Sequence, residues 1–261
     1  MTTTVLKLIA LLAMIIDHIG YFIPNTPYWF GWIGRIAAPL FIFCVVWGYS
    51  YTRDIKKYLI RLYSFSVGMS ILSLIINLLY NDTYRYITSN FFAPLFLIAF
   101  IIYLINNKNI KGLIVLFLWQ FVSFALSVIL VEFIQLPHLN NVKPLYVFYG
   151  SLFGNIFLVE GGILFVAIGL LLYFTKNNKK MLSIMYILIS ILSFFLFRRL
   201  GYDRGFVSLI VPFADYQWMM IAALPLMLLY NNKKGIGLKY FFYIFYPVHI
   251  IVLYIIGNNL R

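Results

Sequence analysis

Apolar runs close to 20 residues long recur along the whole chain, and they limit its fold more than any other feature. A helix rises about 1.5 Å per residue, so about 20 apolar residues cross the hydrocarbon core of a bilayer. Of the 261 residues, 64% are hydrophobic and 10% are charged, whereas a soluble domain carries roughly 25% charged residues. We therefore predict an all-α, polytopic helical membrane protein of the cytoplasmic membrane.

The apolar runs predict about nine transmembrane helices, within a range of about eight to ten. They cover residues 5–23, 30–51, 58–80, 89–106, 111–134, 153–175, 181–198, 208–230 and 239–257. The segment 135–152 contains Pro137 and Pro144 and is a candidate for a short re-entrant or interfacial piece. No internal repeat, linker or low-complexity tract divides the chain, so we predict a single domain over residues 1–261.

The net charge of +13 comes from lysines and arginines that gather in short loops between the apolar runs. Four such loops fall on the same side of the membrane if the N-terminus is cytoplasmic, as the positive-inside rule predicts. They contain Arg53, Lys56 and Lys57; Lys108 and Lys111; Lys176, Lys179 and Lys180; and Lys233, Lys234 and Lys239. Because this distribution explains the charge, we expect no nucleic-acid partner.

Cys44 is the only cysteine and lies within an apolar run. One cysteine cannot form a disulfide within its chain or a multi-thiolate metal site. We therefore interpret Cys44 as a small core residue and predict no bound metal.

Several ionisable or polar residues interrupt the apolar runs. Counted along the predicted helices, they reach a layer between the middle and the outer half of the membrane. Isolated charge is expensive in a bilayer, so we expect these groups to face one shared cavity. They are Asp17, His18, Arg35, Glu160, Asp215, Gln217 and His249.

Adjacent residues on a helix point about 100° apart. Asp17 is therefore expected to pair with Arg35 rather than to orient its neighbour His18. The ion pair has a purely structural alternative, in which it only holds helices together. Glu160 and His249 are the alternatives for orienting His18, and His249 also has the plain role of an interhelical hydrogen-bonding residue.

Three prolines and one lysine refine this expected site. Proline leaves the carbonyl four residues earlier without its helical donor. Pro39 therefore frees the carbonyl of Arg35, Pro225 frees that of Ile221 and Pro247 frees that of Tyr243. Lys7 lies eleven residues before His18, which places both on one helix face about 16 Å apart. A cation at the mouth of a cleft and a histidine deeper inside it suit a phosphate-bearing substrate.

A series of short motifs in this order resembles the TraX family, the membrane pilin acetylases of conjugation systems. The resemblance covers nearly the whole chain. It rests on Leu6-Lys7-Leu8-Ile9-Ala10, Asp17-His18-Ile19-Gly20, Gly34-Arg35-Ile36-Ala37, Pro39-Leu40-Phe41, Gln217-Trp218, Ala223-Leu224-Pro225, Tyr230-Asn231 and Phe242-Tyr243-Ile244-Phe245-Tyr246-Pro247-Val248-His249. A weaker likeness to acyltransferase family 3 lies in the spacing from a basic residue to a histidine, with Lys7 where that family has arginine.

The resemblance implies transfer of an acetyl group from cytoplasmic acetyl-CoA to an acceptor outside, which is a pilin, another peptide or a surface glycan. Histidine has an unperturbed pKa near neutrality, so His18 is the expected general base. Asp17, Arg35, Glu160 and His249 are expected around it, with Arg35 as a possible oxyanion stabiliser. The expected contacts to CoA are Lys7, Lys56, Lys57 and Gln217.

Buried Asp, Glu, Arg and His with broken helices also describe a proton-coupled transporter or a lipid flippase. Such proteins often contain inverted repeats, and this sequence has none that is convincing. An assembly scaffold is a third alternative, but it explains the buried charges poorly. The sequence does not predict the acceptor or the oligomeric state.

Overall fold

The computed structural model describes residues 1–80, 85–134, 139, 141–200 and 214–260. The described part is all helical, as predicted, and contains no strand. Its elements are α1 (Thr3–Phe22), α2 (Trp29–Gly34), α3 (Ala37–Ser50), α4 (Ile55–Tyr80), α5 (Phe92–Asn106), α6 (Ile110–Phe133), α7 (Lys143–Phe153), α8 (Gly162–Thr175), α9 (Lys179–Leu200), the 3-10 helix η1 (Ala214–Ala223), α11 (Leu224–Leu228) and α12 (Lys239–Asn259).

Six helical segments in the described residues are long and apolar enough to cross a membrane. They are Thr3–Phe22, Trp29–Ser50, Ile55–Tyr80, Ile110–Phe133, Lys179–Leu196 and Tyr240–Asn259. Shorter apolar helices at Phe92–Asn106, Gly162–Thr175 and Tyr216–Leu228 lie where three further spans were predicted. The chain is a multi-pass membrane protein, while the count of about nine spans and the cytoplasmic N-terminus stay predictions.

Helix α6 shows why a bilayer is needed. Phe117, Phe121 and Val122 on this helix are each more than half exposed in the isolated chain. Large apolar side chains rarely gather on a surface that faces water. A lipid environment accounts for their exposure.

The predicted helix 153–175 is wrong in its first third. Helix α7 ends at Phe153, and α8 begins only at Gly162. Gly154 and Gly161 between them have φ angles of 64° and 71°, a left-handed conformation that ends a helix and that glycine adopts without strain. Helix α7 itself occupies part of the segment 135–152 that was a candidate for a short extra piece.

The second predicted span is interrupted at Arg35 and Ile36, between α2 and α3. The N–H groups of both residues donate to the carbonyls three residues earlier, on Trp32 and Ile33. Pro39 follows, and it has no N–H to offer the carbonyl of Arg35. The tight turn therefore sets α2 apart from α3 while keeping one apolar segment from Trp29 to Ser50.

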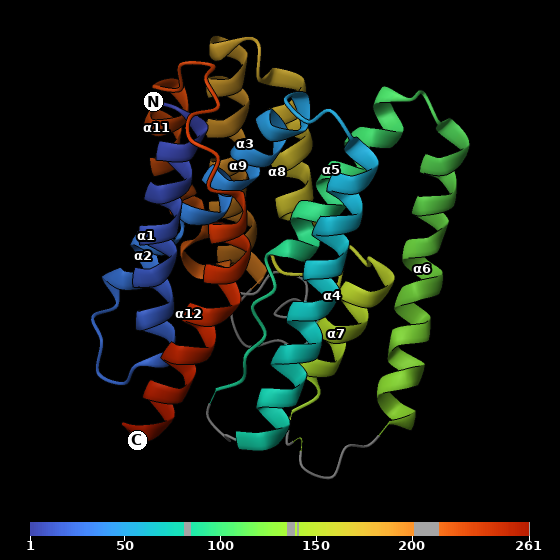
Figure 1. Cartoon of the computed structure of the whole chain (residues 1–261), viewed down its shortest axis with the longest axis vertical. Helices are drawn as coiled ribbons and strands as arrows, with labels where there is room; N and C mark the ends of the chain where they lie inside the picture. The colour runs from blue at the N-terminus through green and yellow to red at the C-terminus, as the bar shows by residue number, and fades with distance from the viewer. Residues whose placement is uncertain (81–84, 135–138, 140, 201–213, 261) are drawn as a thin grey trace. The chain divides into compact units, whose positions relative to one another are not determined.

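The described chain forms two compact units, and the prediction of a single domain stays a prediction. The first unit contains residues 1–51, 167–204 and 213–261. In it α1 packs against α2, α3 and α12, and α9 packs against η1 and α11. Figure 1 shows α1 and α12 running side by side in the same direction.

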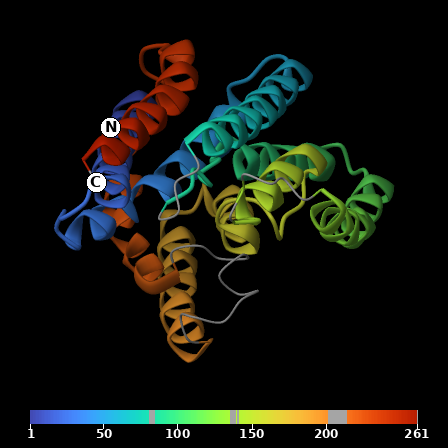
Figure 2. The same cartoon turned by 90° about the horizontal axis from the view of Figure 1, so that it is seen from below.

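The second unit contains the described residues of 52–166. Helix α4 packs against α5 and α7, and α6 packs against α5 and α7 (Figure 2). Buried polar groups join these helices: the Asn90 amide donates to the Ser66 carbonyl and to the Ser151 hydroxyl, both at 2.8 Å. Such bonds satisfy polar groups that lipid cannot.

The start of α1 is tied to the segment that precedes α12. The Thr3 hydroxyl donates to the Lys234 carbonyl at 2.6 Å, and the Thr4 hydroxyl donates to the Ile236 carbonyl at 2.7 Å. The Thr3 N–H also donates to the Lys233 carbonyl at 3.0 Å. These bonds fix the register in which α1 and α12 lie together.

Candidate functional site

Helix α1 presents two ionisable neighbours to two different helices. Asp17 and His18 are adjacent in sequence, so their side chains point about 100° apart around the helix axis. Asp17 contacts Arg35, which lies between α2 and α3, whereas His18 contacts His249 of α12. The candidate site therefore has two faces, both inside the first unit.

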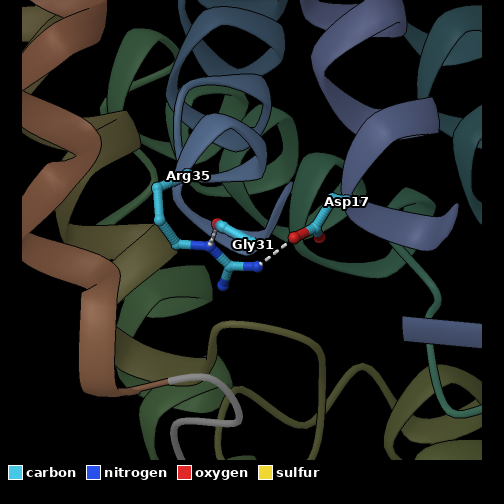
Figure 3. A network of polar contacts seen from close by, with 3 residues as sticks. All are labelled: Asp17, Gly31 and Arg35. Carbon is cyan, nitrogen blue, oxygen red and sulfur yellow. Dashed lines mark hydrogen bonds and ion pairs between the residues drawn. The ribbon is translucent and has the colours of Figure 1, made fainter. Parts of the chain in front are cut away.

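The first face is an ion pair. Arg35 Nη2 lies 2.7 Å from Asp17 Oδ1, and Arg35 Nε donates to the Gly31 carbonyl at 3.0 Å (Figure 3). Arg35 is 8% exposed, so the pair is largely withdrawn from water. The predicted pairing of Asp17 with Arg35 is confirmed.

Gly34 allows this ion pair to form. A Cβ atom at Gly34 would collide with the Asp17 carboxyl group and its Cβ. The lack of a side chain at this position lets the carboxylate of α1 lie directly against α2. Helix α2 is thus shaped to receive Asp17.

The second face is a pair of histidines. His18 Nδ1 lies 2.8 Å from His249 Nε2, and the planes of the two rings differ by 16°. Both residues are buried. Of the two predicted partners for orienting His18, the structure brings His249 to it.

The backbone carbonyl of Phe245 determines which ring nitrogens of His249 and His18 carry protons. His249 Nδ1 lies 2.9 Å from the Phe245 carbonyl oxygen, which can only accept. His249 Nδ1 must therefore carry a proton and donate it. In neutral His249 the Nε2 atom is then an acceptor, so His18 donates through Nδ1. Neutral His18 is left with its lone pair on Nε2, the atom that a general base needs.

Lys7 and His18 lie on the side of α1 that faces α12. Lys7 Nζ lies 5.6 Å from the ring centroid of Phe242, and the Phe245 ring lies 5.2 Å from that of His249. Phe242, Phe245 and His249 recur at helical spacing, so they form one stripe on α12. The stripe contacts α1 at Lys7 and again at His18.

The other predicted contacts to CoA lie elsewhere. Gln217 is buried in η1, where its side-chain amide donates to Met220 Sδ at 3.6 Å. Lys56 and Lys57 are exposed at the start of α4, in the second unit. Lys57 Nζ lies 3.3 Å from Asp54 Oδ2. The binding roles of these three residues stay predictions.

Asp54 also caps α4. Its Oδ1 atom accepts the Lys57 backbone N–H at 3.0 Å. This hydrogen bond, with the nearby Lys57 side chain, holds the pKa of the Asp54 carboxyl group below its usual value.

Glu160 is not in a helix interior. It lies in the turns between α7 and α8 and belongs to the second unit. Its predicted meeting with His18 stays a prediction. The side chain of Asp215, another predicted member of the polar layer, lies outside the described part of the structure.

Sequence reasoning missed two features. One is the Phe245 carbonyl, whose role depends on the rotamer of His249 and leaves no trace in the sequence. The other is an aromatic cluster of Trp47, Tyr51, Tyr173 and Tyr230 around Lys176. Its signal was present, since aromatic residues flank lysines at the ends of three predicted helices. In the described chain, no three His, Cys, Asp or Glu side chains gather as a metal site would need.

A comparison with protein families identifies the chain. The model of the family described as TraX protein matches residues 2–257, which is nearly the whole length. No curated protein and no solved structure matches the sequence. Because the match extends from α1 through most of α12 and includes both faces of the candidate site, this chain is a member of the TraX family.

Proposed function

We propose that this protein is a membrane acetyltransferase that moves the acetyl group of cytoplasmic acetyl-CoA to a hydroxyl or amine of an acceptor on the other side. The acceptor class is a pilin, another peptide or a surface glycan. Membership of the TraX family supports this proposal. The observation that carries it is the hydrogen-bonded chain from the Phe245 carbonyl through His249 to His18, which leaves His18 Nε2 as a proton acceptor.

The reaction follows from this polarity. His18 Nε2 takes the proton of the acceptor as its oxygen or nitrogen attacks the thioester carbonyl carbon. The new carbon–oxygen or carbon–nitrogen bond forms, and the carbon–sulfur bond breaks. The imidazolium then returns the proton to the leaving CoA sulfur. His249 Nε2 accepts from His18 Nδ1 throughout, which stabilises the transient positive charge.

Arg35 has a positioning role in this proposal. Its Nε and Nη2 donors are directed at the Gly31 carbonyl and the Asp17 carboxylate. A guanidinium held in this way orients the α1–α2 hairpin and therefore the helix that bears His18. We expect the oxyanion of the thioester to find its donors elsewhere.

The position of Lys7 suggests from which side of the membrane each substrate enters. CoA is a polyanion confined to the cytoplasm, and a lysine near the start of α1 suits its phosphates. His18 lies eleven residues further along the same helix, about 16 Å deeper. The donor therefore enters from the end that carries Lys7, and the acceptor arrives from the opposite end.

The test uses sealed vesicles and acetyl-CoA with ¹⁴C in the acetyl group and ³H in the adenine. Inside-out vesicles should consume acetyl-CoA at once, whereas right-side-out vesicles should ignore it until they are permeabilised. Only ¹⁴C should reach the acceptor or appear as free acetate. The reverse dependence on vesicle orientation would overturn the proposed sidedness.

His18→Ala should abolish the ¹⁴C transfer and keep the protein in the membrane. Ser190→Ala is the matched control, because Ser190 is a buried hydroxyl of α9 that bonds only within its own helix, to the Tyr186 carbonyl. Wild-type transfer by His18→Ala would remove the general base from the proposal. Movement of both labels together into the vesicles would identify a transporter instead.

A further inference from the structure

One end of the first unit collects cations without carboxylates. The bond of the Thr3 hydroxyl to the Lys234 carbonyl brings the start of α1 to the segment before α12, and the bond of Lys179 Nζ to the Leu228 carbonyl brings the start of α9 to the end of α11. Lys176 Nζ donates to the Ser50 hydroxyl at the end of α3, at 2.6 Å. Where the structure describes side chains in this unit, Asp17 is the sole carboxylate, and it is paired with Arg35.

Lys176 lies close to two aromatic rings. Its Nζ atom lies 5.5 Å from the Trp47 ring centroid and 5.1 Å from that of Tyr173. No ion pair to Lys176 occurs in the described part of the chain. Partial burial lowers the pKa of this ammonium group. One N–H donates to Ser50, so the ammonium keeps further donors for an anion.

An exposed ring lies next to this cation. The Trp47 and Tyr51 ring centroids are 6.3 Å apart, and the two planes differ by 22°. Tyr51 is 37% exposed. Its hydroxyl donates to the Asn232 carbonyl at 2.8 Å and accepts from the Tyr230 hydroxyl at 3.0 Å. Both bonds hold the ring in place, so stacking on it needs little new ordering.

Trp47, Tyr51, Lys176 and Lys179 form what we name the Tyr51 surface. The positive-inside rule explains lysines at this end of the helices. It does not explain why Lys176 lies over two aromatic rings. It also does not explain why hydrogen bonds hold the Tyr51 ring in place while the ring stays partly exposed. A flat heteroaromatic group that carries phosphates matches both, because it stacks on the ring and its phosphates pair with the ammonium groups.

We propose that the Tyr51 surface binds the adenosine 3′,5′-bisphosphate portion of CoA, with the adenine on Tyr51 and phosphates at Lys176 and Lys179. This proposal rests on the proposed acetyl transfer for the identity of the ligand. Lys7 at the same end then marks the way from the nucleotide toward His18. A lipid headgroup shares the phosphate but has no ring to stack.

The probe is adenosine 3′,5′-bisphosphate, titrated calorimetrically into the full-length protein in phosphatidylcholine nanodiscs. Tyr51→Leu removes the ring and should weaken binding by about tenfold or more, while Tyr51→Phe keeps the ring and should stay within about threefold of wild type. Lys176→Met should also weaken binding about tenfold. Lys111→Met is the control, because Lys111 is an exposed lysine in the first turn of α6, in the second unit.

Each other outcome decides against the surface. Equal losses in Lys176→Met and Lys111→Met would mean that only overall charge attracts the probe. Inorganic pyrophosphate that binds as well as the nucleotide, and is displaced by phosphatidylglycerol in the nanodisc, would identify a lipid headgroup site. Size-exclusion profiles show which variants fold, and the comparison of Lys176→Met with Lys111→Met keeps the test valid if Tyr51→Leu does not fold.

The assay contains no acetyl group, so the two proposals fail separately. Ring-dependent nucleotide binding without any acetyl transfer would refute the acetyltransferase alone. Acetyl transfer that persists unchanged in Tyr51→Leu and Lys176→Met would refute the Tyr51 surface alone.

Discussion

The two faces of α1 treat their ionisable residues in opposite ways. On the α2 side, Asp17 meets a full positive charge at 2.7 Å, and the Arg35 guanidinium has a second acceptor in Gly31. On the α12 side, His18 meets another neutral ring, and the chain of donors ends at a backbone carbonyl. The first face is closed by charge neutralisation. The second leaves one nitrogen with a lone pair.

This difference separates stability from chemistry on a single helix. A buried ion pair contributes little net free energy of folding when it is intact. Removing only one of its two charges lowers stability strongly, because the other charge stays buried without a partner. A neutral histidine pair carries no net charge, and His18 Nε2 keeps a lone pair that can take up a proton. We therefore expect variants of the α2 face to lose stability and variants of the α12 face to lose turnover.

The largest effect should follow from removing one charge of the ion pair. Arg35→Gln leaves the Asp17 carboxylate buried without its cation, so the free energy of unfolding in detergent should fall by about 3–5 kcal/mol. The double variant Asp17→Asn with Arg35→Gln should be no less stable than Arg35→Gln alone. Strictly additive losses in this cycle would mean that the two side chains do not act as a pair.

Removing the second ring should mainly change turnover. His249→Ala takes away the acceptor for His18 Nδ1–H and should lower kcat of acetyl transfer by about 100-fold with little change in KM. His249→Gln offers an amide oxygen to the same N–H and should recover part of the rate. A rise in KM with unchanged kcat would point to a role in binding the donor instead.

A single methyl group should test whether the α2 face depends on close approach. Gly34→Ala forces the Asp17 carboxyl group away from α2, and overpacking of this kind costs about 1–3 kcal/mol. Thermal unfolding in detergent measures the loss. Gly48→Ala is a suitable control, because a Cβ at Gly48 meets open space.

The smallest effect should come from Asp54 and Lys57, an exposed pair of the same chemistry as Asp17 and Arg35. The Lys57 N–H holds the pKa of Asp54 below its unfolded value, so its contribution is present at neutral pH and is lost as the pH falls through the folded pKa. The protection factor of the Lys57 amide, which is the ratio of its intrinsic to its observed hydrogen-exchange rate, should therefore fall under acidic conditions. Asp54→Ala should remove this acid dependence while barely changing the melting temperature. A large drop in melting temperature would contradict the contrast between the buried and the exposed pair.

Sequence reasoning succeeded where a helix alone determines direction. The apolar runs predicted helices. The angle of about 100° between adjacent side chains on a helix predicted that Asp17 would pair with Arg35 and would not orient its neighbour His18. The contact of His18 with His249 needed more, because depth along two helices says that they reach one layer but not that they face each other. Here the bonds of Thr3 and Thr4 near Lys234 set the register.

Sequence reasoning failed where backbone conformation decided. An apolar run over 153–175 looks continuous, yet left-handed glycines at 154 and 161 separate α7 from α8 and place Glu160 in a turn. The proton position on His18 depends on one carbonyl distance and has no sequence signal.

The separation of the partners along the chain imposes an order on biosynthesis. Arg35 follows Asp17 by 18 residues, so both partners of the ion pair exist once the first 35 residues have been made. His249 follows His18 by 231 residues, which at about 5–20 residues per second is a delay of about 10–50 s. During that interval α1 can already pair its carboxylate, whereas its histidine has no partner ring. The contact between His18 and His249 can form only when the last helix has been made.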